Sequence, residues 1–167
     1  MRLRIAASLL AAALLVPSAA LAVSAALNAE ANATFLSTNA RKPGVQVMRD
    51  GLQYRVLKPG FGNRPKPGDM VTVYYSLSLI NGEKVQGTEE DFPAQFPVNE
   101  LIAGWREALQ NMREGDHWQL FVPSNLGYGP AGAADGSIPP NQTLIFDIQL
   151  VKTETPPEKP KKDDDQQ

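Results

Sequence analysis

Residues 68–85 read GDMVTVYYSLSLINGEKV, and the expected fold follows from the pattern within this stretch. Five apolar or aromatic positions, from Val71 to Leu79, alternate with residues that carry hydroxyl groups. Because successive side chains of a β-strand point to opposite faces, this alternation predicts a strand with one apolar face. The pair Asn81-Gly82 follows at once, and both residue types tolerate positive φ, so a hairpin turn is expected there.

Further strands are expected on both sides of this stretch. Trp118, Leu120 and Val122 alternate in a second strand, and residues 144–150 repeat the pattern in a third. Shorter apolar runs at 52–57 and 94–98 add to the predicted sheet. The glycine- and proline-rich segment 123–143 is expected to be a long loop, and long loops in small domains often carry function.

One segment inside the predicted sheet has helical periodicity. Ile102, Trp105, Leu109 and Met112 recur at spacings of three and four, which places them on one helix face. Asn99 or nearby backbone is expected to cap the start of this helix, and Gly115 to stop it. Several strands and one short helix predict an antiparallel α+β domain over residues 43–152.

The two ends of the chain differ from this domain. Residues 1–22 have an arginine-containing start, a short apolar run and a small-x-small end at Ala22, the pattern of a cleaved signal peptide; a membrane anchor is the alternative. Residues 23–42 predict a short N-terminal extension, with a helix near 28–40. Residues 153–167 are charged and proline-rich, which predicts a disordered tail. Export to the periplasm, or secretion, is therefore expected.

The composition excludes several classes of function. The chain has 167 residues, 16 Lys and Arg against 18 Asp and Glu, and no cysteine. A net charge of −2 argues against nucleic-acid binding, which requires clustered Lys and Arg to neutralise phosphates. With no cysteine and with His117 as the single histidine, we expect no disulfide, no metal site and no cofactor. Neither a phosphate-binding glycine motif nor a GxSxG serine motif is present.

Aromatic side chains are the remaining candidates for a functional site. Tyr75 and Phe146 lie on expected strands, Trp105 on the helix and Tyr128 in the long loop. Each of them alone could be a core residue. Together with the loop they indicate an apolar pocket, which could favour a reaction by shape and desolvation without proton transfer.

Three stretches of the chain resemble one protein family. Residues 101–116 read LIAGWREALQNMREGD, similar to the family's helix motif VIxGWxEgLxxMxxG. Residues 122–150 read VPSNLGYGPAGAADGSIPPNQTLIFDIQL, similar to IPxxLAYGxxG…IPPNxTLxFDVEL, and residues 68–85 resemble GdxVxVhYtGxLxdGxxF. On these motifs the chain is identified as a member of the FK506-binding-protein (FKBP) type of peptidyl-prolyl cis–trans isomerase. It resembles the exported bacterial branch that includes macrophage infectivity potentiators.

The resemblance implies a curved antiparallel β-sheet wrapped around one short α-helix, with a prolyl pocket between them. Trp105 would form the floor of the pocket, and Tyr128 would donate its hydroxyl to a substrate carbonyl. The catalytic residues that the resemblance implies are Tyr75, Trp105, Tyr128 and Phe146. The substrate-binding residues that it implies are Val85, Gln86, Leu101, Ile102 and Ile138.

The implied activity is rotation of X–Pro bonds in exported proteins. Its partners would be proline-containing polypeptides and macrolides of the FK506 or rapamycin type. Rotation about a peptide bond has a barrier of about 18–20 kcal/mol because the planar amide is stabilised by resonance. The twisted transition state has lost that resonance and is less dipolar, so a water-poor aromatic pocket should favour it.

Three departures from the family pattern leave alternatives open, and one of them is a loop from Val85 to Pro93 that is about one residue shorter than usual. The family usually has Phe-Asp where this chain has Val85-Gln86, and an aromatic pocket position corresponds to Ala94, a gap that Phe92 or Phe96 could fill. A chaperone or peptide-binding module with weak or no isomerase activity is the alternative function. An adaptor that recruits a partner through its acidic tail is a further one. Residues 23–42 are too few for a dimerising arm, so a monomer is expected.

Overall fold

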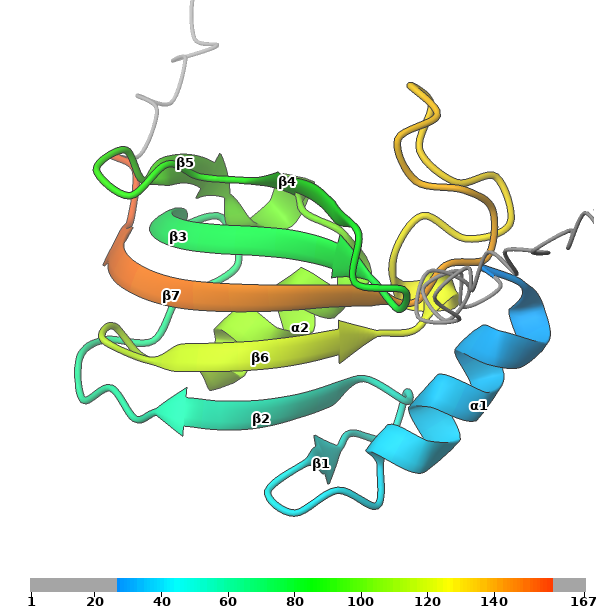
Figure 1. Ribbon diagram of the computed structural model, residues 1–167. Helices are drawn as coiled ribbons and strands as arrows, with labels where there is room; N and C mark the ends of the chain where they lie inside the picture. The colour runs from blue at the N-terminus through cyan, green and yellow to red at the C-terminus, as the bar shows by residue number, and fades with distance from the viewer. Residues whose placement is uncertain (1–26, 158–167) are drawn as a thin grey trace, which may run out of the picture.

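The computed structural model describes residues 27–157 and centres on a seven-stranded antiparallel sheet (Figure 1). The strands follow the order β1-β2-β6-β7-β3-β4, and β5 also pairs with β3. The expected α+β class, with a sheet wrapped around a helix, is confirmed. In chain order the elements are α1 (Ala29–Asn39), β1 (Gln46–Val47), β2 (Gln53–Lys58), β3 (Met70–Leu79), β4 (Lys84–Gly87), β5 (Ala94–Pro97), the 3₁₀ helix η2 (Val98–Glu100), α2 (Ala103–Asn111), β6 (His117–Val122), the 3₁₀ helix η3 (Ser124–Leu126) and β7 (Leu144–Glu154).

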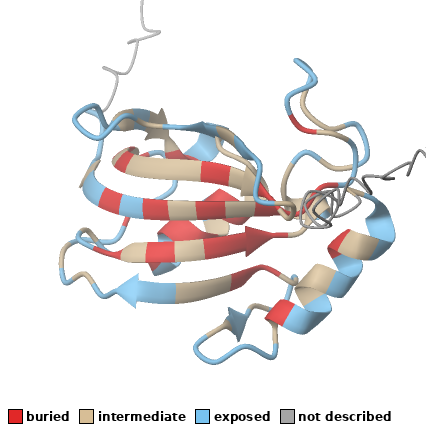
Figure 2. Ribbon diagram, viewed as in Figure 1, coloured by how far each residue is buried: buried red, intermediate tan, exposed pale blue. Residues whose placement is uncertain are grey.

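The core lies between α2 and the central strands β3, β7 and β6, where buried positions alternate along each strand (Figure 2). On β3 the alternation places Val71, Val73, Leu77 and Leu79 in the core. The alternating apolar residues of β6 and β7 are buried on the same side. The period-two pattern is therefore confirmed in β3 and β7, whereas in β6 Phe121 on the other face is also buried, next to Phe35 of α1.

Helix α2 presents its apolar face to the sheet, as its spacing predicts. Trp105, Leu109 and Met112 are buried in the core. Close packing requires Gly104, because a Cβ at this position would come within 2.6 Å of a Val122 methyl group on β6. The expectation of an Asn99 side-chain cap is not met: this residue lies in η2, and the first turn of α2 has no side-chain cap.

The hairpin and the long loop have well-defined hydrogen bonds. Residues 80–83 connect β3 to β4, with Gly82 at φ 85° and a 2.9 Å bond from the Leu79 N–H to the Glu83 carbonyl. The segment 123–143 contains η3 and is closed by a bond from the Asn141 N–H to the Gly129 carbonyl at 2.9 Å. Within this segment the chain turns back on itself before entering β7.

The two expected extensions lie partly within the described residues. The helix expected near 28–40 is present as α1, which packs at the edge of the sheet near β2 and the end of β6 (Figure 1). The expected start of the tail is corrected, because β7 continues to Glu154 and the Thr155 hydroxyl donates to Asp69 at 2.8 Å. The predicted signal peptide, residues 1–22, and residues 158–167 lie outside the described part. Within residues 27–157, no helix has the length and apolar character needed to cross a membrane.

Candidate functional site

A small cavity opens between α2, β3, β5 and the loop after η3. It has a volume of about 170 Å³, below the roughly 300–1,000 Å³ of pockets that enclose a drug-sized ligand, so one ring could enter it. Nine residues line it: Tyr75, Gln86, Phe96, Glu100, Leu101, Ile102, Trp105, Tyr128 and Phe146. The structure thus brings together the four aromatic residues that sequence analysis singled out.

Trp105 forms the centre of the aromatic lining. Three rings meet it edge-on: Phe146 at 5.2 Å between centroids, Tyr75 at 5.4 Å and Phe96 at 6.1 Å, with interplanar angles of 82–89°. Edge-to-face pairs of this kind stabilise an aromatic cluster beyond the area that they bury. The Trp105 indole N–H is buried without an acceptor among residues 27–157, so packing holds this ring in place.

Two phenol groups supply polar atoms to this apolar cavity. Burial raises the pKa of Tyr75, and the neighbouring Tyr128 hydroxyl raises it further. The Tyr75 phenol therefore stays protonated at neutral pH and can act as a hydrogen-bond donor. Tyr128 is partly exposed, and backbone bonds from Gly127 and Gly129 to the Ser124 carbonyl fix its position in the loop.

The start of α2 contributes backbone groups to the same wall. Leu101 and Ile102 line the cavity, and Ile102 is the N-cap residue of α2. N–H groups in the first turn of a helix have no partner within the helix and favour an acceptor outside it. Within residues 27–157 the Ile102 N–H makes no hydrogen bond, so it is available to a ligand carbonyl.

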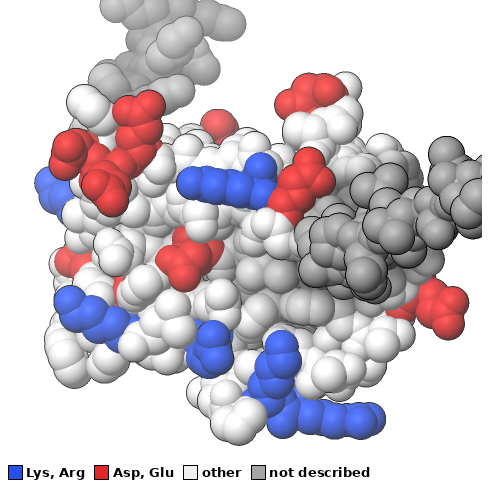
Figure 3. Space-filling view, in the orientation of Figure 1, with Lys and Arg blue, Asp and Glu red and all other residues white. Residues whose placement is uncertain are grey.

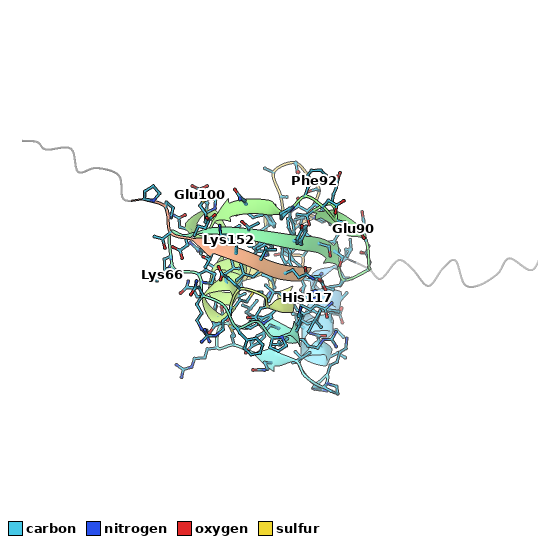
Figure 4. All side chains as sticks on the ribbon, turned by 90° about the vertical axis from the view of Figure 1, so that its left-hand side faces the viewer. Lys66, Glu90, Phe92, Glu100, His117 and Lys152 are labelled. Atoms are coloured by element: carbon cyan, nitrogen blue, oxygen red, sulfur yellow. The ribbon has the colours of Figure 1, made fainter. Side chains whose placement is uncertain are left out.

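Phe96 fills the aromatic gap that the sequence leaves open at Ala94. It lies on β5 opposite Val71, and its ring packs 6.0 Å from the Tyr75 ring. Phe92 is 70% exposed and lies with Glu90 on the loop that joins β4 and β5 (Figure 4). Of the two alternatives, the structure therefore places Phe96 at the cavity.

Two expected site residues do not line the cavity. The β3–β4 register shifts at Val85, so that Val85 packs against the core while Gln86 lines the cavity. Ile138 is 3% exposed and belongs to the core cluster. Glu100 lines the cavity without having been expected there; as an exposed polar residue just before α2, it carries no signal in the apolar periodicity.

The single histidine, His117, is not among the residues that line the cavity. It lies at the start of β6, where its Nε2 pairs with Asp147. Among residues 27–157, no group of three or more His, Cys, Asp and Glu side chains is placed to hold a metal ion. The cavity lining combines aromatic rings with the polar side chains of Tyr75, Tyr128, Gln86 and Glu100.

Comparison with known families identifies this arrangement. Residues 62–151, which include every residue that lines the cavity, match the family described as FKBP-type peptidyl-prolyl cis-trans isomerase. The chain belongs to this family. A second match, to the domain amino terminal to FKBP-type peptidyl-prolyl isomerase, covers residues 11–56.

Curated relatives place this FKBP-type chain in the Mip-like branch. It is 48% identical over 118 residues to the outer membrane protein MIP of Legionella longbeachae, covering 70% of this chain and 50% of that protein. It is 45% identical over 125 residues to the peptidyl-prolyl cis-trans isomerase Mip of Coxiella burnetii, covering 74% of this chain and 54% of that one. The chain thus spans about half the length of the curated relatives that it matches.

Solved FKBP-type structures have the same fold. A peptidyl-prolyl cis-trans isomerase from Pseudomonas syringae superposes with a TM-score of 0.71 at 36% identity, covering 75% of this chain and 92% of that one. FkpA from Escherichia coli superposes with a TM-score of 0.72 at 34% identity, covering 77% of this chain and 62% of that one.

Proposed function

We propose that this FKBP-type chain accelerates cis–trans isomerisation of X–Pro bonds by binding the proline ring over Trp105. The observation that carries the proposal is the cavity itself, in which three rings stand edge-on around Trp105 and two phenols border the opening. An apolar cavity of this size suits one pyrrolidine ring better than a charged or extended side chain. The family membership of residues 62–151 supports the same activity.

The mechanism is stabilisation of a twisted amide. Rotation breaks the amide resonance and reduces the dipole of the peptide group. The transition state therefore loses less hydration free energy than the planar amide when it moves from water into the cavity. We expect the Ile102 N–H and the Tyr128 hydroxyl, which belong to residues that line the cavity, to bind substrate carbonyls. No proton is transferred. Uncatalysed exchange takes roughly 10–100 s at 25 °C, so a folding helper of this kind has a clear use.

The first test is NMR exchange between the cis and trans forms of Phe-Pro and Leu-Pro peptides with residues 23–167. Acceleration that falls several-fold in Tyr128→Phe and in Trp105→Leu supports the proposal. Ser137→Ala, in the same loop but outside the cavity lining, serves as the control. A folded protein with no effect on exchange would contradict the proposal and would leave a peptide-binding module of the same fold.

The pair Val85-Gln86 bears on how efficient the site is. Gln86 lines the cavity, and no hydrogen bond joins it to Tyr75 among the described residues. A carboxylate at this position could accept a bond from a phenol and fix its orientation. A large rate gain in Val85→Phe/Gln86→Asp would show that the natural site is catalytically weakened.

The location, partners and assembly belong to the same proposal. The signal-like residues 1–22 and the exported Mip-like relatives support a periplasmic or secreted protein that acts on exported chains. Macrolides of the FK506 type would compete with proline peptides for the cavity, a property that displacement of a bound peptide measures. Figure 3 shows that acidic and basic side chains are interspersed on one face of the molecule. We expect a monomer in sedimentation experiments.

A further inference from the structure

A buried hydrogen-bond network connects the first turns of α1 to the end of the long loop. Asn32 is 4% exposed, and its Oδ1 accepts a 2.7 Å bond from the Thr143 N–H. Its Nδ2 donates to the Gln142 Oε1 at 3.2 Å and to the Asn28 carbonyl at 2.9 Å. The oxygen and the nitrogen of the Asn32 side-chain amide are therefore both hydrogen-bonded. Loss of this side chain would leave the Thr143 N–H and the Gln142 Oε1 without these partners.

Gln142 continues the network into the loop. It is 2% exposed, and its Nε2 donates to the Pro140 carbonyl at 2.9 Å. Between these two residues, Asn141 adopts a φ of 60°, and its N–H donates to the Gly129 carbonyl at 2.9 Å. That bond closes the loop immediately after Tyr128, so the contacts run without a break from α1 to the edge of the cavity.

We propose that Asn32 is a positioning residue for the prolyl pocket: it holds the base of the loop 129–141 and thereby keeps Tyr128 at the cavity. Figure 1 shows the start of α1 below this loop, where the hydrogen bonds join them. The effect on catalysis rests on the proposed isomerase function. The effect on the loop does not.

The chain offers a matched control on the same helix. Asn39 is also a buried asparagine of α1, at 1% exposure, but its Nδ2 donates to the Gln53 Oε1 on β2 at 3.0 Å. Asn32→Ala and Asn39→Ala therefore remove the same side chain at similar burial, and only the first removes a contact to the loop.

The experiment measures amide hydrogen exchange and X–Pro isomerisation on the full chain. We expect Asn32→Ala to speed exchange of the Asn141 amide by about tenfold, the factor that corresponds to one buried hydrogen bond. We also expect a several-fold loss of isomerase rate in this variant. Asn39→Ala should change both quantities by about twofold or less.

The outcomes separate this inference from the proposed function. Wild-type exchange at Asn141 in Asn32→Ala, or equal effects of the two variants, would overturn the positioning role. If the wild-type chain does not catalyse isomerisation, the proposed function fails and the exchange of Asn141 alone decides the role of Asn32. If Asn32→Ala does not fold, exchange of the Asn141 amide is measured in Gln142→Met, which keeps the side-chain length and removes the bonds of Gln142 to Asn32 and to the Pro140 carbonyl; wild-type exchange in that variant would overturn the positioning role.

Discussion

Phe96 illustrates how one side chain determines the shape of the cavity. Its ring lies against both Tyr75 and Trp105, whereas Phe92, four residues earlier, is mostly exposed. We predict that Phe96→Leu lowers the isomerisation rate several-fold, because the wall loses an aromatic edge and the cavity admits more water. Phe92→Leu should leave the rate within about twofold of wild type. NMR exchange measures both rates, and equal effects of the two substitutions would contradict the assignment.

Glu107 makes the stability of the fold depend on pH. A hydrogen bond that the protonated Glu107 donates to the Asp50 carboxylate, burial and the charge of Asp50 raise the pKa of Glu107 from an ordinary 4.5 to about 7. Between these values the folded chain binds more protons than the unfolded chain, so the free energy of unfolding should fall as the pH rises from about 4.5 to about 7. The lowered pKa of Asp50 acts below this window, where its contribution is lost as the pH falls.

The substitution Glu107→Gln tests this pH dependence. Because glutamine does not ionise, the variant should lose the decline in the free energy of unfolding between about pH 4.5 and 7. Urea unfolding at several pH values measures the slope, and Glu83→Gln on the exposed β3–β4 turn is the control. An unchanged slope in Glu107→Gln would show that Asp50 and Glu107 do not interact in solution.

Among the elements, α2 depends most closely on its fit against the sheet. Its apolar face is buried over β6, and Gly104 allows the helix backbone to approach Val122. We predict that Gly104→Ala lowers the free energy of unfolding by about 1–3 kcal/mol, because the added methyl group overpacks against a stiff, buried side chain. Chemical denaturation measures the change. Gln110→Ala, on the exposed side of α2, should stay within about 0.5 kcal/mol of wild type.

For the molecule as a whole, α1 is part of the folded domain. An isolated helix of 11 residues is marginal in water, so α1 depends on its contacts with β2 and the loop. Four hydrogen bonds of Asn32, Asn39 and Gln53 connect it to the domain, and Phe35 packs 6.0 Å from Phe121. The domain expected over residues 43–152 omits all of these contacts.

Removal of α1 should therefore destabilise the whole domain. At about 1 kcal/mol for each buried hydrogen bond, less the entropy of ordering the helix, we predict that residues 43–157 are about 2–3 kcal/mol less stable than residues 27–157. Thermal and urea unfolding of the two fragments measure the difference. Equal stability would show that α1 docks too weakly to contribute.

The sequence pattern was sufficient for the long strands and for α2, whereas the family resemblance implied most of the cavity residues. Alternation in β3, β6 and β7 and the three- and four-residue spacing of α2 depend only on neighbours along the chain, which is why local periodicity reveals them. Contacts between distant residues required the folded structure. Whether Phe92 or Phe96 completes the cavity depends on which residues of β5 face Trp105. The packing of Val85 against the core accompanies a register shift between β3 and β4. The contact of Asn32 with Thr143 joins positions 111 residues apart. No local pattern encodes such a contact, because it forms only when packing brings the two segments together.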